Sequence, residues 1–238
     1  MHRRRGGTAT HATLARWLEL WNDQAKNTVL RDIYSDLVKR YSEPHRHYHN
    51  LPHISRCLQD LTEARSHADH PFEVELALWF HDAVYDPRRS DNEEASAGYA
   101  METLGKLTEK EILERIRSLI LATRHTDPPR SDDERLIADI DLAILGRPTK
   151  EFQEYEDGIR QEYNWVPEDR FKARRAELLA RFLAREHIYH TDHFREKYEE
   201  NARANLSHSI STLRASSPSM NTLVHDNVTR RLPAPQEP

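Results

Sequence analysis

The chain has 238 residues, of which 37% are hydrophobic and 32% charged, with 6 glycines and a formal net charge of -5. This length allows one sizeable core, and the scarcity of glycine favours helices over a sandwich or barrel, which needs more turns. The negative charge argues against binding of a DNA or RNA polymer or of a membrane surface. The single cysteine, Cys57, excludes an internal disulfide framework and a cysteine-rich zinc module, and we expect its thiol to be buried and inert.

Neither end of the chain shows an apolar pattern. Residues 1–11 have a basic start with no apolar stretch behind it, which predicts a flexible leader rather than a secretory signal. Residues 214–238 are rich in serine and proline and predict a disordered tail. No apolar run is long enough to span a bilayer. We therefore expect one domain over residues 12–213, located in the cytoplasm; a homodimer is compatible with the sequence.

Helix-start signals recur along this domain, and no segment alternates apolar and polar residues as a strand would. We therefore expect an all-α fold, a single compact bundle of about eight or nine helices. The expected starts are Pro52 after the cap Asn50, Pro71, a cap at Ser90 or Asp91, a capping box of Thr108 and Glu111, Ser131, Pro167 and Thr191. The first of these helices should run to about His67, the second to about Val84 and the fifth to Gly146.

The most informative feature is the dipeptide His81-Asp82, which follows the most apolar run in the sequence, residues 76–80. A helix that buries this run carries two ligand-type side chains toward the core. Burying an ionised carboxylate costs several kcal/mol unless it is paired or bound to a metal. The sequence therefore predicts a partner for Asp82, and a divalent cation suits it best.

Two further ligand-type residues lie on other predicted helices. His53 is in the first turn of the Pro52 helix, and Asp141 has apolar neighbours three and four positions away. Asp139, beside Arg135, is expected to be the more solvent-exposed of the two aspartates. Two imidazoles and two carboxylates form a mixed nitrogen and oxygen set, which suits Mn²⁺, Fe²⁺, Co²⁺, Ni²⁺, Zn²⁺ or Mg²⁺ without choosing among them.

In this order, His53, His81-Asp82 and Asp141 resemble the signature of the HD superfamily of metal-dependent phosphohydrolases, whose fold is all-α. More narrowly, the chain is similar to a branch of predicted HD phosphohydrolases without a settled substrate, over roughly residues 12–210. The resemblance implies that these four residues bind one divalent metal ion. The segments that carry it are 48–54, 79–86, 91–97, 120–125, 139–146, 188–191, Phe194 and 202–206.

Other site residues follow less directly from the pattern. Asp82 suits both ligation and orientation of a water molecule. Glu93 is our first choice for the base that accepts a proton from this water; Glu94 is its rival, and Asp86 or a histidine are further alternatives. Asp86 could instead polarise a ligand histidine. The pair Glu93-Glu94 is equally compatible with a solvated first turn that complements a helix dipole.

Two more histidines are candidates for contact with the substrate. His49 precedes the Pro52 helix, and contact with the substrate or support of a metal ligand suits it better than direct metal binding. His125 follows an apolar helix and could bind a substrate phosphate, ligate a second metal or be a plain loop residue. It is the only histidine between His81 and Asp141, which favours a site with one metal ion.

The leading functional hypothesis is a metal-dependent phosphohydrolase that cleaves a small phosphate ester, such as a nucleotide, with a metal-activated water. The alternatives are a non-catalytic metal- or nucleotide-binding module and a dinuclear iron oxygenase on the same fold. Six basic residues of the Pro167 helix are expected to spread around it as a solvated face, with one or two able to reach a phosphate. The four tryptophans, including Trp165, are expected to pack in the core.

Overall fold

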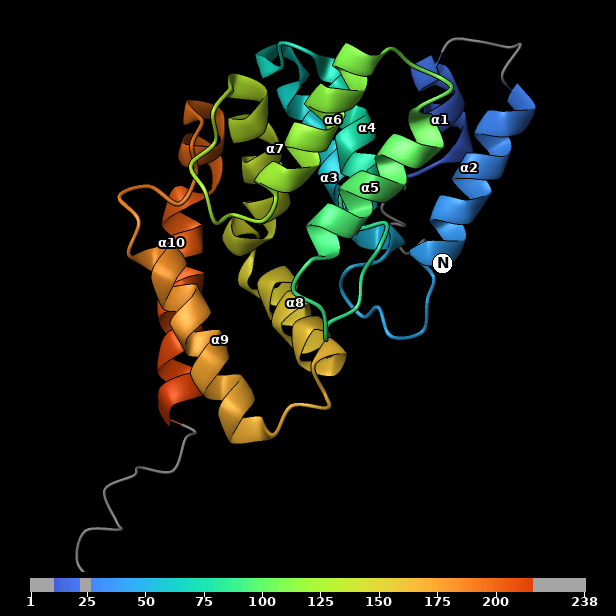
Figure 1. Cartoon of the computed structure of the whole chain (residues 1–238). Helices are drawn as coiled ribbons and strands as arrows, with labels where there is room; N and C mark the ends of the chain where they lie inside the picture. The colour runs from blue at the N-terminus through green and yellow to red at the C-terminus, as the bar shows by residue number, and fades with distance from the viewer. Residues whose placement is uncertain (1–10, 22–26, 216–238) are drawn as a thin grey trace, which may run out of the picture.

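The computed structural model describes residues 11–21 and 27–215, and in these ranges it contains ten α-helices, two short 3-10 helices and no strand (Figure 1). The predicted all-α fold is confirmed, with slightly more helices than expected. The α-helices are α1 Leu14–Trp21, α2 Asn27–Arg40, α3 Leu51–Ala64, α4 Pro71–Phe80, α5 Asn92–Leu104, α6 Lys110–Ala122, α7 Asp132–Leu142, α8 Thr149–Glu162, α9 Glu168–Leu183 and α10 Asp192–Ala215. The 3-10 helices are η2 Arg65–His67 and η3 Ala143–Gly146.

Helix α4 is the centre of the bundle. Its residues from Glu73 to Phe80 are all buried, and α3, α5, α6 and α7 each contact it. A helix that is apolar on nearly every side is stable only where other elements cover it completely. Its two buried acidic residues are paired, Glu73 with Arg115 at 2.7 Å and Glu75 with Arg16 at 2.7 Å. The residues that follow Phe80 therefore emerge inside the protein.

Helices α9 and α10 pack side by side and form one flank of the molecule, with α8 between them and the α4-centred helices (Figure 1). The 3-10 helix η3 packs closely against α10. A Cβ added at Gly146 would lie 2.5 Å from Cβ and 2.6 Å from the carbonyl oxygen of Tyr198, so only glycine allows this approach. The buried ion pair of Asp60 and Arg147, at 2.7 Å, joins α3 to the same region.

Several predicted helix starts are confirmed by hydrogen bonds. Side chains at the ends of α3, α7 and α10 accept bonds from backbone N–H groups that a helix leaves without partners. These bonds run from His53 N to Asn50 at 3.3 Å, from Glu134 N to Ser131 at 3.1 Å and from Phe194 N to Thr191 at 3.4 Å. The expected ends at His67 and Gly146 are reached through η2 and η3.

One predicted cap and one predicted end are wrong. Helix α6 starts after Glu109 and has no side-chain cap, so Thr108 and Glu111 do not form a capping box. Helix α4 ends at Phe80 rather than near Val84. It stops there because the backbone N–H of Val84 donates to Ser96 of α5, at 3.1 Å, instead of continuing the helical ladder.

The predicted ends of the domain lie close to the limits of the described residues. Residues 1–10 of the predicted leader and 216–238 of the predicted tail lie outside them. His11 donates its backbone N–H to Ser55 at 2.7 Å, and α10 continues to Ala215. Among the helices described, none combines the length and the apolar character that a membrane span requires.

Candidate metal centre

His81 is fixed by the end of α4. Its backbone N–H donates to Ala77 at 2.8 Å, so the residue continues the last helical turn. Its ring nitrogen Nδ1 lies 2.9 Å from the carbonyl oxygen of Leu78, which can only accept, so Nδ1 carries the proton. The lone pair of Nε2 is therefore directed away from the helix, as a metal ligand requires.

The side chains of His53, His81, Asp82 and Asp141 come together although they belong to α3, the turn after α4, and α7. The two Nε2 atoms are 3.2 Å apart. Nε2 of His53 lies 3.5 Å from Oδ2 of Asp82 and 3.3 Å from Oδ1 of Asp141, and Nε2 of His81 lies 3.1 Å and 3.5 Å from the same atoms. Donor atoms bound at about 2.1 Å to one cation at tetrahedral or octahedral angles are about 3.0–3.4 Å apart. The cluster thus has the spacing of a coordination shell.

The Oδ2 atom of Asp82 is buried and lacks a hydrogen bond among the residues that the structure describes. Its nearest polar neighbours are the Nε2 atoms of His81, at 3.1 Å, and of His53, at 3.5 Å, and a buried carboxylate oxygen without a hydrogen bond is costly. A divalent cation between the four side chains would satisfy this oxygen, so the donor set suits such an ion.

The two aspartates of the cluster favour their negatively charged form, and the two histidines favour their positively charged form. Burial by itself would raise the pKa of Asp82 and Asp141, yet the imidazoles, His81 foremost for Asp82 and His125 for Asp141, hold the pKa of both carboxyls well below its ordinary value. Burial likewise opposes protonation of His53 and His81, but Cys57 and Tyr48 foremost for His53, and Asp82 foremost for His81, raise the pKa of both rings well above the usual range. A divalent cation would replace these ring protons, since histidine binds metals through a neutral nitrogen.

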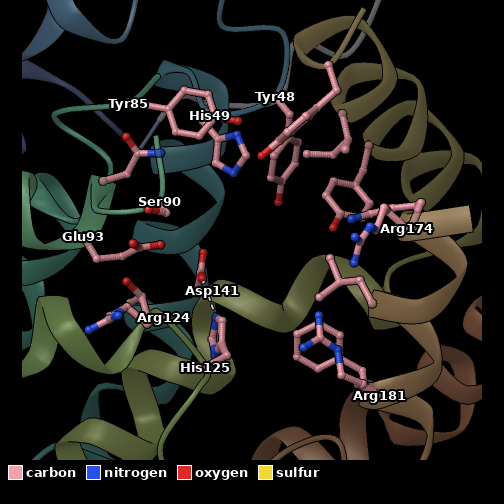
Figure 2. A pocket seen from close by; sticks show the side chains of 18 of the residues that line it. Tyr48, His49, Tyr85, Ser90, Glu93, Arg124, His125, Asp141, Arg174 and Arg181 are labelled. Atoms are coloured by element: carbon pink, nitrogen blue, oxygen red, sulfur yellow. Dashed lines mark hydrogen bonds and ion pairs between the residues drawn. The ribbon is translucent and has the colours of Figure 1, made fainter. Parts of the chain in front are cut away.

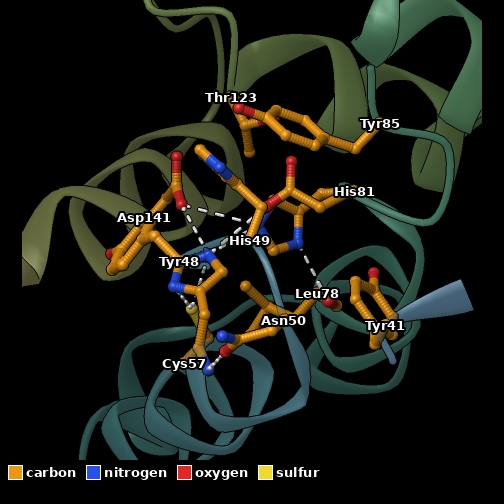
Figure 3. Close-up of polar contacts among 12 residues, drawn as sticks. Tyr41, Tyr48, His49, Asn50, Cys57, Leu78, His81, Tyr85, Thr123 and Asp141 are labelled. Atoms are coloured by element: carbon orange, nitrogen blue, oxygen red, sulfur yellow. Dashed lines mark hydrogen bonds and ion pairs between the residues drawn. The ribbon is translucent and has the colours of Figure 1, made fainter. Parts of the chain in front are cut away.

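Cys57 is a fifth potential ligand that the sequence did not suggest. It is buried as predicted, and with His53, His81 and Asp141 it forms a group that could hold a metal ion (Figure 3). Its sulfur lies 3.7 Å from Nε2 and 3.8 Å from Nδ1 of His53. A sulfur equally far from both nitrogens lies beside the ring rather than along one lone pair, so Asp82 is the better-placed fourth ligand.

His125 is tied to the cluster through Asp141. Its Nε2 lies 2.8 Å from Oδ2 of Asp141, while Oδ1 of the same carboxylate faces His53. Its backbone has φ of 55°, a left-handed conformation that a residue with a side chain rarely adopts. Arg185, which donates to the carbonyl oxygen of His125 at 3.0 Å, helps to hold this conformation. The histidine therefore orients the carboxylate from the cavity side.

The prediction for Asp139 is wrong, because this residue is completely buried. Its carboxylate accepts bonds of 2.7 Å from the backbone N–H groups of His190 and Thr191 and from the Thr191 hydroxyl. Burial raises the pKa of Asp139 to about 6 in spite of these bonds. Its role is to fix the start of α10, and Asp141 alone of the pair faces the cluster.

Arg46 positions the metal centre from behind, a role that its sequence position does not reveal. Its buried guanidinium donates to the carbonyl oxygens of His49 at 3.0 Å, Asp82 at 2.6 Å and Ala83 at 3.1 Å. Five donors in one plane can join several carbonyl groups at once. Arg46 therefore locks the turn that carries His81 and Asp82 against the loop that carries His49.

Glu162 is the second residue missed, and it fixes His49. One carboxylate oxygen accepts from the backbone N–H groups of three consecutive residues, 47–49, at 2.7–2.9 Å. The other lies 2.7 Å from Nδ1 of His49 and accepts from the Tyr85 hydroxyl at 2.8 Å. Despite burial, the hydrogen bond and charge of His49 and the backbone bonds lower the pKa of Glu162 to about 2.

A cavity of about 970 Å³ opens beside the cluster. Figure 2 shows His49, Tyr85, Glu93, Arg124, His125 and Asp141 around one part of it and Arg174 and Arg181 around the other. Trp165 lines the rim and is 46% exposed, so its predicted place in the core is wrong. The cavity is large enough for a small organic ligand.

The three carboxylates considered as bases differ in their surroundings. Glu93 lines the cavity, and burial is the main cause that raises its pKa. Glu94 is exposed and pairs with Arg124 at 2.7 Å. Asp86 is exposed and accepts from the backbone N–H of Arg88 at 2.9 Å, while His81 has Leu78 as its partner. Glu93 therefore has the placement that a base for a cavity water requires.

Comparison of the chain with protein-family models, with curated proteins and with solved structures finds no match in any of the three.

Proposed function

We propose that this protein is a metal-dependent phosphohydrolase of the HD type that cleaves a small phosphate ester. The observation that carries the proposal is the cluster of His53, His81, Asp82 and Asp141 beside a large cavity, with ligand-like spacing and an Asp82 oxygen that makes no hydrogen bond among the described residues. The resemblance of the same residues, in the same order, to the HD signature supports it. Arginines on the cavity wall suit an anionic substrate.

The four residues would hold one divalent cation, through Nε2 of each histidine and one oxygen of each aspartate. When bound, such an ion lowers the pKa of a water molecule and neutralises charge on phosphoryl oxygens. Asp82 also lies at the cavity and orients the attacking water. Asp141 is held in position by His125, at 2.8 Å, so its ligand oxygen keeps its direction.

Glu93 and His49 supply the remaining chemistry in this proposal. Glu93 accepts the proton of the attacking water, and its raised pKa makes it a stronger base than an ordinary glutamate. His49 uses Nδ1 to bind Glu162, which leaves Nε2 to face the ligand. In its cationic form, this ring would donate from Nε2 to a phosphoryl oxygen.

The test pairs metal content with phosphate release. Wild type and Asp82→Ala are purified, their metal is measured, and both are assayed on phosphate esters and nucleotides with each of the six cations. We expect about one metal per wild-type chain, and a variant that loses metal and at least about 10³ of its activity. Asp86→Ala removes an exposed aspartate nearby and should keep both.

The outcomes separate the proposal from its alternatives. Full activity of Asp82→Ala with chelator present would overturn the mechanism. Bound metal with no phosphate release from any ester would favour the binding module. Two irons per chain with a visible absorption band would favour the oxygenase, which needs a second set of ligands beyond His125.

A further inference from the structure

One face of α9 carries a row of arginines toward the cavity. Arg170, Arg174 and Arg181 all line it, as does Arg185 just beyond the helix end. At about 100° per residue, the first three point within about 40° of one another, so the helix presents them as a single row. The expected spread around the helix is wrong for these residues. Lys172 and Arg175 point in other directions from the helix axis, although Arg175 also lines the cavity.

Most of this row lacks a carboxylate partner. Arg174 is the exception, at 3.6 Å from Glu177, and both of these side chains are largely exposed. Arg185 donates to a backbone carbonyl, and the other two, Arg170 and Arg181, make no ion pair within the described residues. Two other arginines have acidic partners: Arg175 of the same helix pairs with Glu156, and Arg147 pairs with the buried Asp60.

Unpaired guanidinium groups that face one cavity create a positive potential inside it. A concave, partly apolar wall strengthens this potential, and guanidinium binds phosphate oxygens in a two-pronged geometry. Arg174 and Arg181 lie across the cavity from Glu93 and Asp141 (Figure 2), whereas Arg185 reaches the carbonyl oxygen of His125. One phosphate group bound at the metal centre would therefore leave the arginine row free to bind a second anionic group of the same molecule.

The size of the cavity supports a ligand with two anionic groups. At about 970 Å³ it is at the upper end of the range for small-molecule sites, far larger than one phosphate group needs. At the rim, Trp165 stacks on Tyr163 with ring centroids 6.3 Å apart and keeps an exposed surface. Such a surface can cover a planar organic group.

We propose that Arg170 and Arg181 of α9 supply a second anion-binding surface of the cavity, so that the substrate is a nucleotide-like molecule with at least two phosphate groups. This inference rests on the proposed function, since it names the substrate class of the same site. One phosphate lies at the metal centre for hydrolysis, and the arginine row binds the other and fixes the orientation of the molecule.

The experiment measures binding without turnover, by titrating AMP and ADP into the metal-loaded Glu93→Gln protein, which lacks the proposed base. Quenching of Trp165 fluorescence, or calorimetry, reports the affinity. We expect ADP to bind about tenfold more tightly than AMP. Adding Arg170→Ala or Arg181→Ala should each lower the affinity for ADP about tenfold and the affinity for AMP less than about twofold. These side chains are exposed, so the variants should fold.

Two controls complete the design. Arg117→Ala removes an exposed arginine of α6 away from the cavity and should leave ADP binding unchanged. Arg181→Lys keeps the charge but not the two-pronged geometry and should recover part of the affinity. Equal affinity for AMP and ADP, or ADP binding that survives loss of both Arg170 and Arg181, would overturn the second anion-binding surface.

The same measurements separate this inference from the proposed function. Phosphate release by wild type, with a KM that the arginine variants do not change, would retain the hydrolase and remove the second anion-binding surface. Arginine-dependent ADP binding without phosphate release from any substrate would retain this surface and remove the hydrolase.

Discussion

The two walls of the cavity hold their charged groups in opposite ways. On the wall that carries Asp82 and Asp141, His53 and His81 lie behind the surface and are almost fully buried, and neighbouring groups fix both rings. On the α9 wall, Arg170 and Arg181 are exposed and have no acidic partner among the described residues. A buried, rigid cluster suits a cation and bond cleavage, whereas exposed, flexible guanidinium groups suit recognition of an anion.

Because the charged groups are buried on one wall and exposed on the other, we expect substitutions on the two walls to have different effects. Changes to the buried wall should alter metal content, stability and turnover together. Changes to the arginine wall should alter the affinity for the substrate and leave metal content and folding intact. Four experiments follow, of which the first, on the metal, and the last, on salt, test this separation.

The largest effect should come from the metal itself. A cation that binds only the folded cluster stabilises the protein by about 3 kcal/mol at a concentration about 100 times Kd. We therefore expect the cation to raise the unfolding temperature of wild type, and to raise that of the Arg170→Ala/Arg181→Ala double variant by the same amount. Chelator should abolish it together with all phosphate release. Unchanged unfolding with every cation tested would contradict the metal centre.

Replacing Glu162 by glutamine should have the next largest effect. Both oxygens of Glu162 accept hydrogen bonds, but glutamine has only one oxygen. If that oxygen stays on the three backbone N–H groups, the NH₂ group faces Nδ1 of His49 and cannot accept from it, so the ring must change tautomer or lose its anchor. We expect kcat to fall about 10- to 100-fold while metal content stays within the wild-type range. Glu154→Gln, an exposed glutamate on the same helix, is the control and should change neither quantity.

The same variant has a defined effect on acid stability. The pKa of Glu162 is about 2 in the folded protein, against an ordinary value of 4.5. Its stabilising contribution is therefore complete above pH 4.5 and is lost as the pH falls toward 2, an effect of about 3 kcal/mol. The free energy of unfolding of wild type, measured by chemical unfolding between pH 5 and 2, should show this loss, and that of Glu162→Gln should not. If the two proteins lost stability in parallel as the pH fell, the lowered pKa of Glu162 would be contradicted.

Salt should produce the smallest effect and the clearest contrast between the walls. Raising ionic strength from about 0.05 M to about 0.5 M shortens the range of interactions between exposed charges and screens buried ones much less. We expect KM for a substrate with two phosphate groups to rise about three- to tenfold, with kcat and metal content within about twofold. A KM that does not change with salt would indicate that the arginine row does not bind substrate.

Local chemistry explains which parts of the site could be predicted. His81-Asp82 stood out because an apolar run must be buried and carries its neighbours with it. His53 and Asp141 were found from their positions on predicted helices. The arginine row was also within reach of the sequence, because spacings of 4 and 7 residues place Arg170, Arg174 and Arg181 on one face.

The residues that were missed or misplaced depend on contacts between distant segments. Glu162 bonds His49 across 113 positions of sequence, and Arg46 reaches the carbonyl oxygen of Asp82 across 36. Asp139 was expected at the surface, yet it meets the backbone of Thr191, 52 positions away. No pattern of local composition marks a residue for such a partner.

The sequence by itself determined the all-α architecture, most helix starts and the residue types available for a metal centre, because apolar periodicity, caps and ligand chemistry are local properties. Only the tertiary structure decided which carboxylates are buried, which histidine nitrogen is free and which arginines remain unpaired. The physical reason is that a polar group's role depends on its solvation and partners, and both are set when remote segments pack together.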